Sequence, residues 1–362
     1  MDRIQITFFG PANSGKSTLV NAICGQEVSL VSPVPGTTTD PVRKIIELPF
    51  GIGPAVLVDT AGYGDESTLG GERERLTRSL IESTDVAVLL ETGHPADRKW
   101  KDMLSKAGVA VVSVDTSFVP DGEGVSRLLK RISENIPGEE QKYLTGNLVK
   151  PGDTVLLVMP QDSEAPKGRL ILPQVNVLRE LLDRGCNALC TTPSTLSAAL
   201  ERLSSLPELV ITDSQVFGEV DAILPEECPL TSFSVLLAAA KGDMPTFLAG
   251  AGAIDSLGPG SRVLIAEACS HVPDTEDIGR VKIPALLRKK AGELTVEIAA
   301  GNDFPEDISS YDLIIHCGAC VASRRLVQSR TRKALLEGVP ITNYGLAIAK
   351  LKGILGRISV PV

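Results

Sequence analysis

The sequence predicts an α/β protein built from three parts, and three observations support this class. Short apolar runs rich in Val, Ile and Leu alternate with amphipathic helical patterns, as in parallel sheets covered by helices. A glycine-rich loop follows the first of these runs. The alternation restarts near residue 147 and continues to the C-terminus, so the 362 residues are enough for two or three domains.

Composition narrows the classes of protein further. The hydrophobic content of 43% supplies ample core, and because aromatics make up only 4%, Val, Leu, Ile and Ala must fill it. The net charge of −9 argues against a general nucleic-acid surface, and no apolar run is long enough to predict a membrane span. Seven unevenly spread cysteines and no recognisable signal peptide predict a reducing, cytoplasmic location without a disulfide framework.

The first motif is a phosphate-binding loop. The apolar run Arg3–Phe9 leads into Gly10-Pro-Ala-Asn-Ser-Gly15-Lys16-Ser17, a G-x-x-x-x-G-K-S pattern, and Thr18–Cys24 is a predicted helix. Backbone N–H groups of such a loop wrap phosphates, while the lysine reaches the β- and γ-phosphates and the serine hydroxyl binds Mg²⁺. The residues expected to contact nucleotide here are Gly10, Asn13, Ser14, Gly15, Lys16, Ser17 and Thr18.

Two further segments complete a predicted nucleotide switch. Gly36-Thr-Thr-Thr-Asp40 follows a Pro-rich stretch, and we expect Thr38 to join the Mg²⁺ shell when a γ-phosphate is present. The strand Ala55–Val58 ends in Asp59-Thr-Ala-Gly62, where Asp59 is expected to support Mg²⁺ and Gly62 to donate its N–H to the γ-phosphate. Lys16, Thr38 and Gly62 are therefore the predicted catalytic residues.

The base-reading part of this domain is degenerate. Where an N-K-x-D motif should follow the strand Val109–Val114, the chain offers Val112-Ser-Val-Asp115, so Asp115 is either a residual guanine reader or merely a strand-end residue. The segment Val125–Ile136 is a predicted closing helix. The apolar runs number five where six strands are expected, which predicts a shortened domain.

The middle of the chain carries no evident chemistry. From about Asn147 the pattern predicts a strand at Thr154–Met159 and an amphipathic helix at Gln174–Arg184. Pro229–Ala240 is predicted to be a helix that is apolar nearly all round, either buried or an association face. The cysteines of this region are interpreted as small core residues: Cys186, Cys190 and Cys228.

Metal-ligand residues gather near the C-terminus in the pattern C-x-H…H-C-x-x-C. Cys269-Ser-His271 follows the apolar run Arg262–Ala266, and His316-Cys317-Gly-Ala-Cys320 follows Asp312–Ile315. The loops beyond the carboxyl ends of parallel strands converge, so we expect the two segments to meet. A helix predicted over Val321–Leu336 would point its positive end at the thiolates.

The residue types leave three interpretations of this pattern open. A structural zinc would be satisfied by four of the five residues, whereas a [4Fe–4S] cluster on the three cysteines would leave one iron open or on a histidine. The third interpretation is buried cysteines and core histidines. A large α/β domain has its own core and does not need a structural metal, which favours a functional cluster.

The motifs carry a resemblance to known families. The P-loop, Gly36-Thr-Thr and Asp59-Thr-Ala-Gly62 resemble the GTPases related to the tRNA-modification enzyme MnmE and to Era, whose potassium-activated members bind K⁺ through a P-loop asparagine; Asn13 occupies that position. Over essentially its full length the chain resembles the HydF family of [FeFe]-hydrogenase maturation GTPases. That resemblance rests on Asp162–Gln174, Ile211–Phe217 and the C-x-H…H-C-x-x-C pattern.

The resemblance implies a domain division and a function. It implies a GTP-binding domain over 1–140, a dimerisation domain over 147–245 and a [4Fe–4S] domain over 246–362. The cluster would sit on Cys269, Cys317 and Cys320, with His271, His316 or an exchangeable ligand at the fourth iron. The chain would be a homodimeric scaffold that carries a diiron subcluster precursor, supplied with the help of radical-SAM maturases, to the apo-hydrogenase.

GTP hydrolysis with Mg²⁺ is expected to be slow and stimulated by K⁺. Two alternatives remain at this point. One is a GTPase regulator with a structural zinc site, and the other is an assembly factor whose nucleotide domain has decayed.

Overall fold

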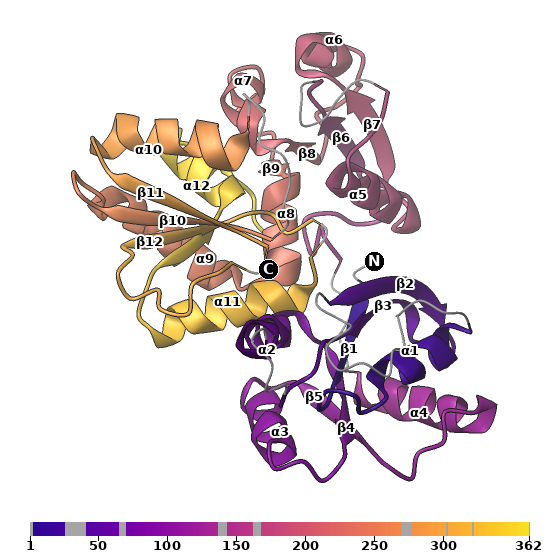
Figure 1. Cartoon of the computed structure of the whole chain (residues 1–362). Helices are drawn as coiled ribbons and strands as arrows, with labels where there is room; N and C mark the ends of the chain where they lie inside the picture. Colours follow the sequence, from indigo (N-terminus) through magenta and orange to yellow (C-terminus); the bar gives the residue numbers. More distant parts are fainter. Residues whose placement is uncertain are drawn as a thin grey trace. The chain divides into compact units, whose positions relative to one another are not determined.

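The computed structural model describes residues 3–25, 41–64, 70–136, 143–161, 168–268, 277–301, 303–320 and 322–361. By its internal contacts the chain divides into two compact units, Met1–Glu140 and Gln141–Val362. Both units are α/β, as Figure 1 shows, and the predicted fold class is confirmed.

The N-terminal unit is built on a five-stranded sheet in the order β2-β3-β1-β4-β5. Only β2 runs antiparallel to its neighbour, and the other pairs are parallel. The strands are β1 (Ile4–Phe9), β2 (Val42–Leu48), β3 (Gly53–Asp59), β4 (Val86–Glu91) and β5 (Ala110–Asp115). The helices are α1 (Lys16–Cys24), α2 (Gly70–Ser79), the 3₁₀ turn η1 (Leu80–Ser83), α3 (Asp97–Lys106) and α4 (Gly122–Asn135). The described sheet thus has the five strands expected of a shortened domain.

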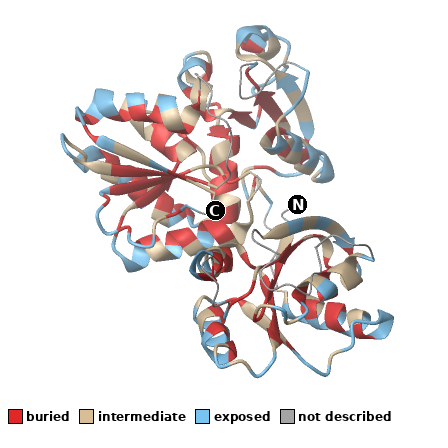
Figure 2. Ribbon diagram, viewed as in Figure 1, coloured by how far each residue is buried: buried red, intermediate tan, exposed pale blue. Residues whose placement is uncertain are grey.

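Apolar side chains cover both faces of this sheet. Leu19 of α1 and Leu128 of α4 belong to the core on one face. Trp100 of α3 packs on the other face with Phe9 of β1 and Leu89 of β4. Because both faces are covered, the parallel strands are nearly continuous apolar runs and appear buried in Figure 2.

The C-terminal unit contains two four-stranded parallel sheets, in the orders β7-β6-β8-β9 and β11-β10-β12-β13. The elements of the first are β6 (Thr154–Val158), α5 (Leu172–Asp183), β7 (Asn187–Thr191), η2 (Pro193–Thr195), α6 (Leu196–Glu201), β8 (Leu209–Thr212), η3 (Ser214–Val216), α7 (Phe217–Asp221), β9 (Leu230–Ser232) and α8 (Phe233–Lys241).

The elements of the second sheet are α9 (Met244–Gly252), η4 (Ala253–Ser256), β10 (Arg262–Glu267), the π-helical turn η5 (Ile278–Lys282), α10 (Ile283–Ala291), β11 (Thr295–Ala300), β12 (Leu313–His316), α11 (Arg324–Leu336), β13 (Ile341–Asn343), α12 (Tyr344–Leu351) and η6 (Leu355–Arg357). Figure 1 shows helices on both faces of this sheet. Because its strands are parallel, their carboxyl ends lie along one edge of the sheet, where ligand sites are usual.

The apolar helix predicted before residue 241 is buried, and it starts later than expected. Leu230–Ser232 pairs with β8 as strand β9, and Ser232 then caps α8 by accepting a hydrogen bond from Val235 N at 3.2 Å. The prediction of helix from Pro229 was therefore wrong, because sheet pairing overrides helical propensity in this short run. Of its three predicted core cysteines, the region buries Cys186 and Cys228, whereas Cys190 is exposed.

Two boundaries near the candidate metal ligands also differ from prediction. His316 is the last residue of β12, paired with Ala266 of β10, and does not follow the strand. The helix expected to start directly after Cys320 begins at Arg324, since Ser323 caps it by accepting from Leu326 N at 3.4 Å. The N-terminus of α11 is therefore farther along the chain from Cys320 than the sequence predicts.

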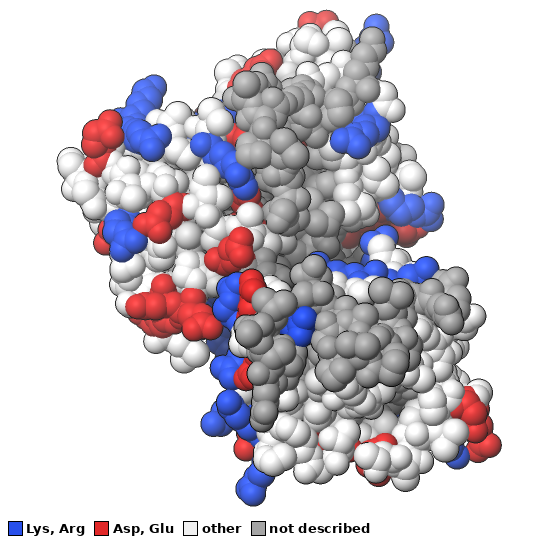
Figure 3. Space-filling view, viewed as in Figure 1, with Lys and Arg blue, Asp and Glu red and all other residues white. Residues whose placement is uncertain are grey.

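The described surface carries charges of both signs. Both acidic and basic side chains occur on the visible face of each unit in Figure 3. Across the described residues, no helix combines the length and apolar character that crossing a bilayer would require.

Candidate functional site

The P-loop follows β1 and ends where Lys16 opens α1. Gly15 has φ 90° and Asn13 φ 60°, the left-handed region that favours glycine and tolerates asparagine. This turn brings Ser17 Oγ to Asp59 at the end of β3, where it donates to Oδ2 at 2.6 Å. The two residues predicted to frame Mg²⁺ are therefore in direct contact.

Lys16 is almost fully buried against the loop that precedes it. Its Nζ donates to Pro11 O at 2.6 Å and to Gly10 O at 3.2 Å. Burial lowers the pKa of Lys16 to about 8, with the Asp59 carboxylate acting in the opposite direction. A bound phosphate would raise this pKa again, because an anion at this point offsets the desolvation of the ammonium group.

Gly62 lies directly over this lysine. A Cβ at Gly62 would lie 2.7 Å from Lys16 Nζ and 2.9 Å from Ala12 N, and the residue has φ 93°, so only glycine fits. The next residue secures the approach, because Ala12 N donates to Tyr63 O at 2.9 Å and Tyr63 N to Gly10 O at 3.3 Å. The D-T-A-G segment and the P-loop thus meet as the motif spacing predicts.

The remaining residues predicted to bind nucleotide differ in how far they are buried. Thr38 lies outside the described residues. Asn13 and Thr18 are exposed and Ser14 is half-buried on the loop and first helical turn. Asp115 ends β5 fully exposed, and hydrogen bonds from Ser117 lower its pKa. The Asp115 carboxylate is thus engaged within its own turn.

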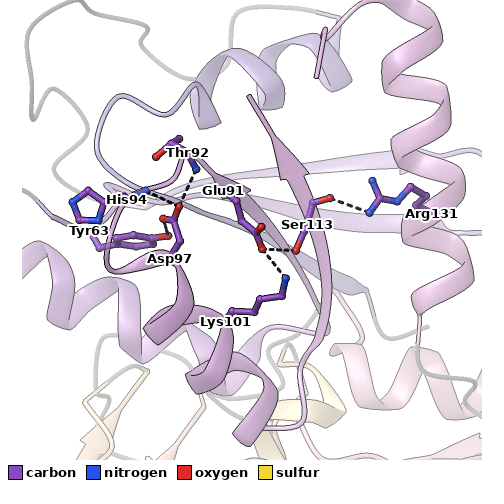
Figure 4. Close-up of polar contacts among 8 residues, drawn as sticks. All are labelled: Tyr63, Glu91, Thr92, His94, Asp97, Lys101, Ser113 and Arg131. Carbon is purple, nitrogen blue, oxygen red and sulfur yellow. Dashed lines mark hydrogen bonds and ion pairs between the residues drawn. The ribbon is translucent and has the colours of Figure 1, made fainter. Parts of the chain in front are cut away.

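A buried tyrosine next to Gly62 was not found from the sequence. Tyr63 donates its hydroxyl to Asp97 Oδ1 at 2.7 Å, and Asp97 Oδ2 accepts from Thr92 N and His94 N at 2.9 and 3.0 Å (Figure 4). The Tyr63 ring also stacks on Trp100, with centroids 4.9 Å apart. The segment after Gly62 is thereby tied to the start of α3.

His94 belongs to the same network as Tyr63 and Asp97. Its Nδ1 accepts from Ala96 N at 3.1 Å, and its ring lies so close to Gly64 that a Cβ there would sit 2.8 Å from Nε2. No motif in the sequence pointed to this arrangement, because Tyr63 and Asp97 are 34 residues apart.

At the C-terminal sheet, the structure places the end of β10 and the following Ala268 against Cys317. Cys317 N donates to Ala266 O at 2.9 Å, extending the pairing of β12 with β10. Cys317 Sγ accepts from Ala268 N at 3.1 Å and from Ala319 N at 3.4 Å. Ala268 is the residue before Cys269, so the chain that leads to Cys269 passes Cys317. Cys269 and His271 themselves lie outside the described residues.

His316 is buried, and both of its ring nitrogens are engaged within the protein. Nδ1 lies 2.8 Å from Cys317 O, which can only accept, so Nδ1 carries the proton. Nε2 then accepts from Arg330 Nη1 at 3.3 Å. Burial, reinforced by the charge of Arg330, lowers the pKa of His316 to about 3. His316 is thus a neutral, oriented imidazole.

The described residues fit a negatively charged metal centre. Cys317 and Cys320 are partly exposed, backbone N–H groups point at Cys317 Sγ, and the buried side chains of Arg330 and Lys241 contact this region. These are the surroundings in which thiolates are stabilised. Within the described ranges no group of three or more His, Cys, Asp or Glu is placed to hold a metal, and Cys269 and His271 are not among those residues.

The fold and these motifs define the class: a P-loop GTPase domain followed by two parallel α/β modules. Family models match in that order, a 50S ribosome-binding GTPase over residues 5–116, the hydrogen maturase F dimerization domain over 144–242 and its tetramerization domain over 245–361. The last two together match more than half of the chain. The chain belongs to the hydrogen maturase F (HydF) family, and the resemblance noted in the sequence is confirmed.

The curated relatives are GTPases that match part of the chain. The tRNA modification GTPase MnmE of Methylobacterium sp. (strain 4-46) is 36% identical over 139 residues, 35% of this chain and 31% of the relative. GTPase Der of Clostridium botulinum (strain Hall) is 40% identical over 146 residues, 37% of this chain and 33% of the relative. The chain therefore spans about a third of the length of the curated relatives it matches.

Solved structures give weaker similarities. Era of Aquifex aeolicus bound to GDP·AlF4⁻ is 17% identical and covers 62% of this chain and 98% of its own, with a TM-score of 0.33. Toc33 of Arabidopsis thaliana with Mg²⁺ and GMPPNP is 16% identical and covers 38% and 85%, with a TM-score of 0.26.

Proposed function

We propose that the chain is a hydrogenase maturation factor that hydrolyses GTP and carries a [4Fe–4S] cluster as the anchor for a diiron precursor. The observation that carries the cluster part is the position of Cys317, whose sulfur accepts two backbone hydrogen bonds where β10 and β12 end, one of them from the residue before Cys269. Amide donors to sulfur are typical of protein-bound iron–sulfur clusters.

The nucleotide part rests on the P-loop contacts. Lys16 is proposed to reach the β- and γ-phosphates, Ser17 and Asp59 to hold Mg²⁺, and Gly62 to donate its N–H to the γ-phosphate. Thr38 is proposed to complete the Mg²⁺ shell. Ser17 and Asp59 already share a 2.6 Å hydrogen bond, and Gly62 lies against Lys16, which supports these roles. Asp115 is retained as the candidate base reader.

The proposed cluster ligands are Cys269, Cys317 and Cys320. Because both ring nitrogens of His316 are engaged by Cys317 O and Arg330, we assign His316 to orienting the segment. His271 or an outside ligand then takes the fourth iron. A cluster with three protein thiolates has one iron that can bind and release cargo.

Anaerobic reconstitution tests the cluster. With iron and sulfide the protein should take up about four irons per chain, and Cys317→Ser or Cys320→Ser should abolish the electron paramagnetic resonance (EPR) signal of the reduced cluster. Cys190→Ser is the matched control, because Cys190 is exposed on β7, which belongs to the other sheet of the C-terminal unit. An unaltered signal in the Cys317 and Cys320 variants would reject both residues as ligands.

Elemental analysis separates this proposal from a GTPase with a structural zinc. Protein purified without oxygen should contain iron and sulfide, whereas stoichiometric zinc without sulfide would support the zinc alternative.

Phosphate release from GTP tests the nucleotide domain. We expect slow turnover that is faster in K⁺ than in Na⁺, because Asn13 occupies the P-loop position that binds K⁺ in related GTPases. Equal rates in the two salts would remove the role proposed for Asn13, and no turnover in either would support a decayed nucleotide domain.

The assembly is also part of the proposal. The matched family models name the two C-terminal parts for dimerisation and tetramerisation, which supports a homo-oligomer. We propose a division of the chain into domains over residues 1–140, 147–245 and 246–362.

The partners are a further part of the proposal. Radical-SAM maturases would help to supply the cargo, and the apo-hydrogenase would receive it in the cytoplasm. Pull-down of the apo-hydrogenase by the reconstituted chain would test the last step, and equal capture by cluster-free protein would contradict it.

A further inference from the structure

A buried lysine at the end of α8 reaches the loop between the two proposed cysteine ligands and the start of α11. Lys241 is 4% exposed, and its Nζ donates to Ala319 O and to Ala322 O, each at 2.8 Å. A buried ammonium group is unfavourable unless it is well paired. Here the described partners are the backbone carbonyls on either side of Cys320.

The lysine comes from the other module of the C-terminal unit. Helix α8 follows β9 and lies within the region matched by the dimerization model, 144–242. Phe233 and Leu236 of α8 pack in the core of the first sheet, while Val235 and Ala238 join the large core that includes the second sheet. The helix is therefore held on both sides, so the position of Lys241 is set rigidly relative to the cysteine loop.

The loop that Lys241 holds has an unfavourable backbone conformation. Ala319 has φ 50°, in the left-handed region that residues with a Cβ adopt rarely. In this conformation Ala319 N donates to Cys317 Sγ at 3.4 Å, while Ala319 O accepts from Lys241. The lysine contact thus supports the backbone turn that directs an amide donor at the sulfur.

Electrostatics acts in the same direction. A cation that is shielded from water interacts more strongly with nearby negative charge than an exposed one. Thiolates and a reduced cluster are negative, and net charge and hydrogen bonds to sulfur set cluster potentials. A buried ammonium group against this loop should therefore favour both cluster retention and the reduced state.

We propose that Lys241 is a positioning residue for the cluster, so that the last helix of the dimerisation module completes the metal site of the following module. This inference rests on the proposed function. It predicts that the C-terminal module alone does not hold the cluster in its native environment, because the loop would lack its buried cation.

The test uses the full chain with Lys241→Met, which keeps the side-chain length and removes the charge. Lys241→Gln is the second variant, because it removes the charge but keeps N–H donors for the carbonyls. Lys289→Met is the control, since Lys289 is exposed on α10. Circular dichroism and size-exclusion chromatography check the fold, and the readouts are iron loss to a chelator, the EPR line shape and the midpoint potential.

We expect Lys241→Met to lose iron about 10- to 100-fold faster, the usual effect of removing an outer contact of a metal site. Its midpoint potential should shift to more negative values, because the reduced cluster loses the stabilisation that the positive charge of Lys241 provides. Lys241→Gln should show the shift in potential with better iron retention, and it decides the question if the Met variant does not fold. The control should match the wild type.

Adding Ala319→Gly to Lys241→Met isolates the backbone contribution. Glycine adopts a positive φ without strain, so iron retention should recover, while the midpoint potential should stay more negative than that of the wild type. No recovery would overturn the role assigned to Lys241 in holding Ala319. Wild-type retention and potential in a folded Lys241 variant would overturn the whole inference, whereas a wild-type protein that binds no iron would instead contradict the proposed function.

Discussion

The hydroxyl of Tyr63 offers a sharp test of how the segment after Gly62 is held. Tyr63→Phe removes the hydrogen bond to Asp97 Oδ1, 2.7 Å long in the structure, and leaves the ring that stacks on Trp100. Asp97 keeps its two backbone donors, Thr92 N and His94 N. The substitution therefore deletes one interaction at a buried position without opening a cavity of any size.

The expected magnitude follows from the charge and burial of the pair. Tyr63 is 1% exposed and Asp97 8%, so solvent cannot replace the missing donor. Hydrogen bonds to charged groups contribute about 1.5–3 kcal/mol. The unfolding equilibrium constant of the N-terminal unit should therefore rise about 10- to 150-fold at 25 °C.

The chain carries its own probe for this measurement. Its single tryptophan, Trp100, lies in α3 and is 1% exposed, so its fluorescence reports unfolding of the N-terminal unit. Urea titrations of Tyr63→Phe and wild type would give the difference in unfolding free energy. Tyr143→Phe is the control, because Tyr143 is 52% exposed and lies in the other unit. A Tyr63→Phe value within about 0.5 kcal/mol of wild type, the usual range for surface changes, would refute the reasoning.

Three further outcomes are expected. Lys16→Ala should weaken binding of a fluorescent GTP analogue by about 10- to 150-fold, the value of a lost charged hydrogen bond, and an unchanged dissociation constant would contradict the P-loop assignment. The ion pair with Lys101 lowers the pKa of Glu91 from 4.5, so its stabilisation is present above that value and lost as pH falls. Glu91→Gln should thus destabilise the protein at pH 7, with the difference narrowing in acid; a difference independent of pH would argue against the pair. Arg330→Met removes the guanidinium hydrogen bonds to Gly301 O and to His316 Nε2 and should cost about 2–5 kcal/mol in urea unfolding followed by circular dichroism, whereas a loss under about 1 kcal/mol would show that water replaces them.

The sequence alone determined the local chemistry of the nucleotide site. A glycine-rich loop between a strand and a helix has few possible conformations, so the spacing from Gly10 to Ser17 was enough to predict it. The same holds for the parallel strands of the N-terminal sheet, because buried parallel strands read as continuous apolar runs. The pairing of Cys317 with the end of β10 was also foreseeable, since parallel strands end at a common edge.

Boundaries were less accessible to sequence reasoning. The residues Leu230–Ser232 look helical because apolar residues continue into α8, and only pairing with β8 makes them a strand. His316 ends β12 for the same reason, because its partner Ala266 lies in a strand far away in the chain. Short runs have nearly equal local preferences, so a few ladder hydrogen bonds decide between them.

Only the tertiary structure revealed the supporting residues. Tyr63 and Asp97 are separated by 34 residues, and Lys241 and Ala319 by 78, so no local pattern links them. Sequence determined which side chains could carry the chemistry, because motif spacing acts over a few residues. The fold decided which buried charges and backbone turns hold those side chains in place, because burial and contact depend on segments that meet only after the chain has folded.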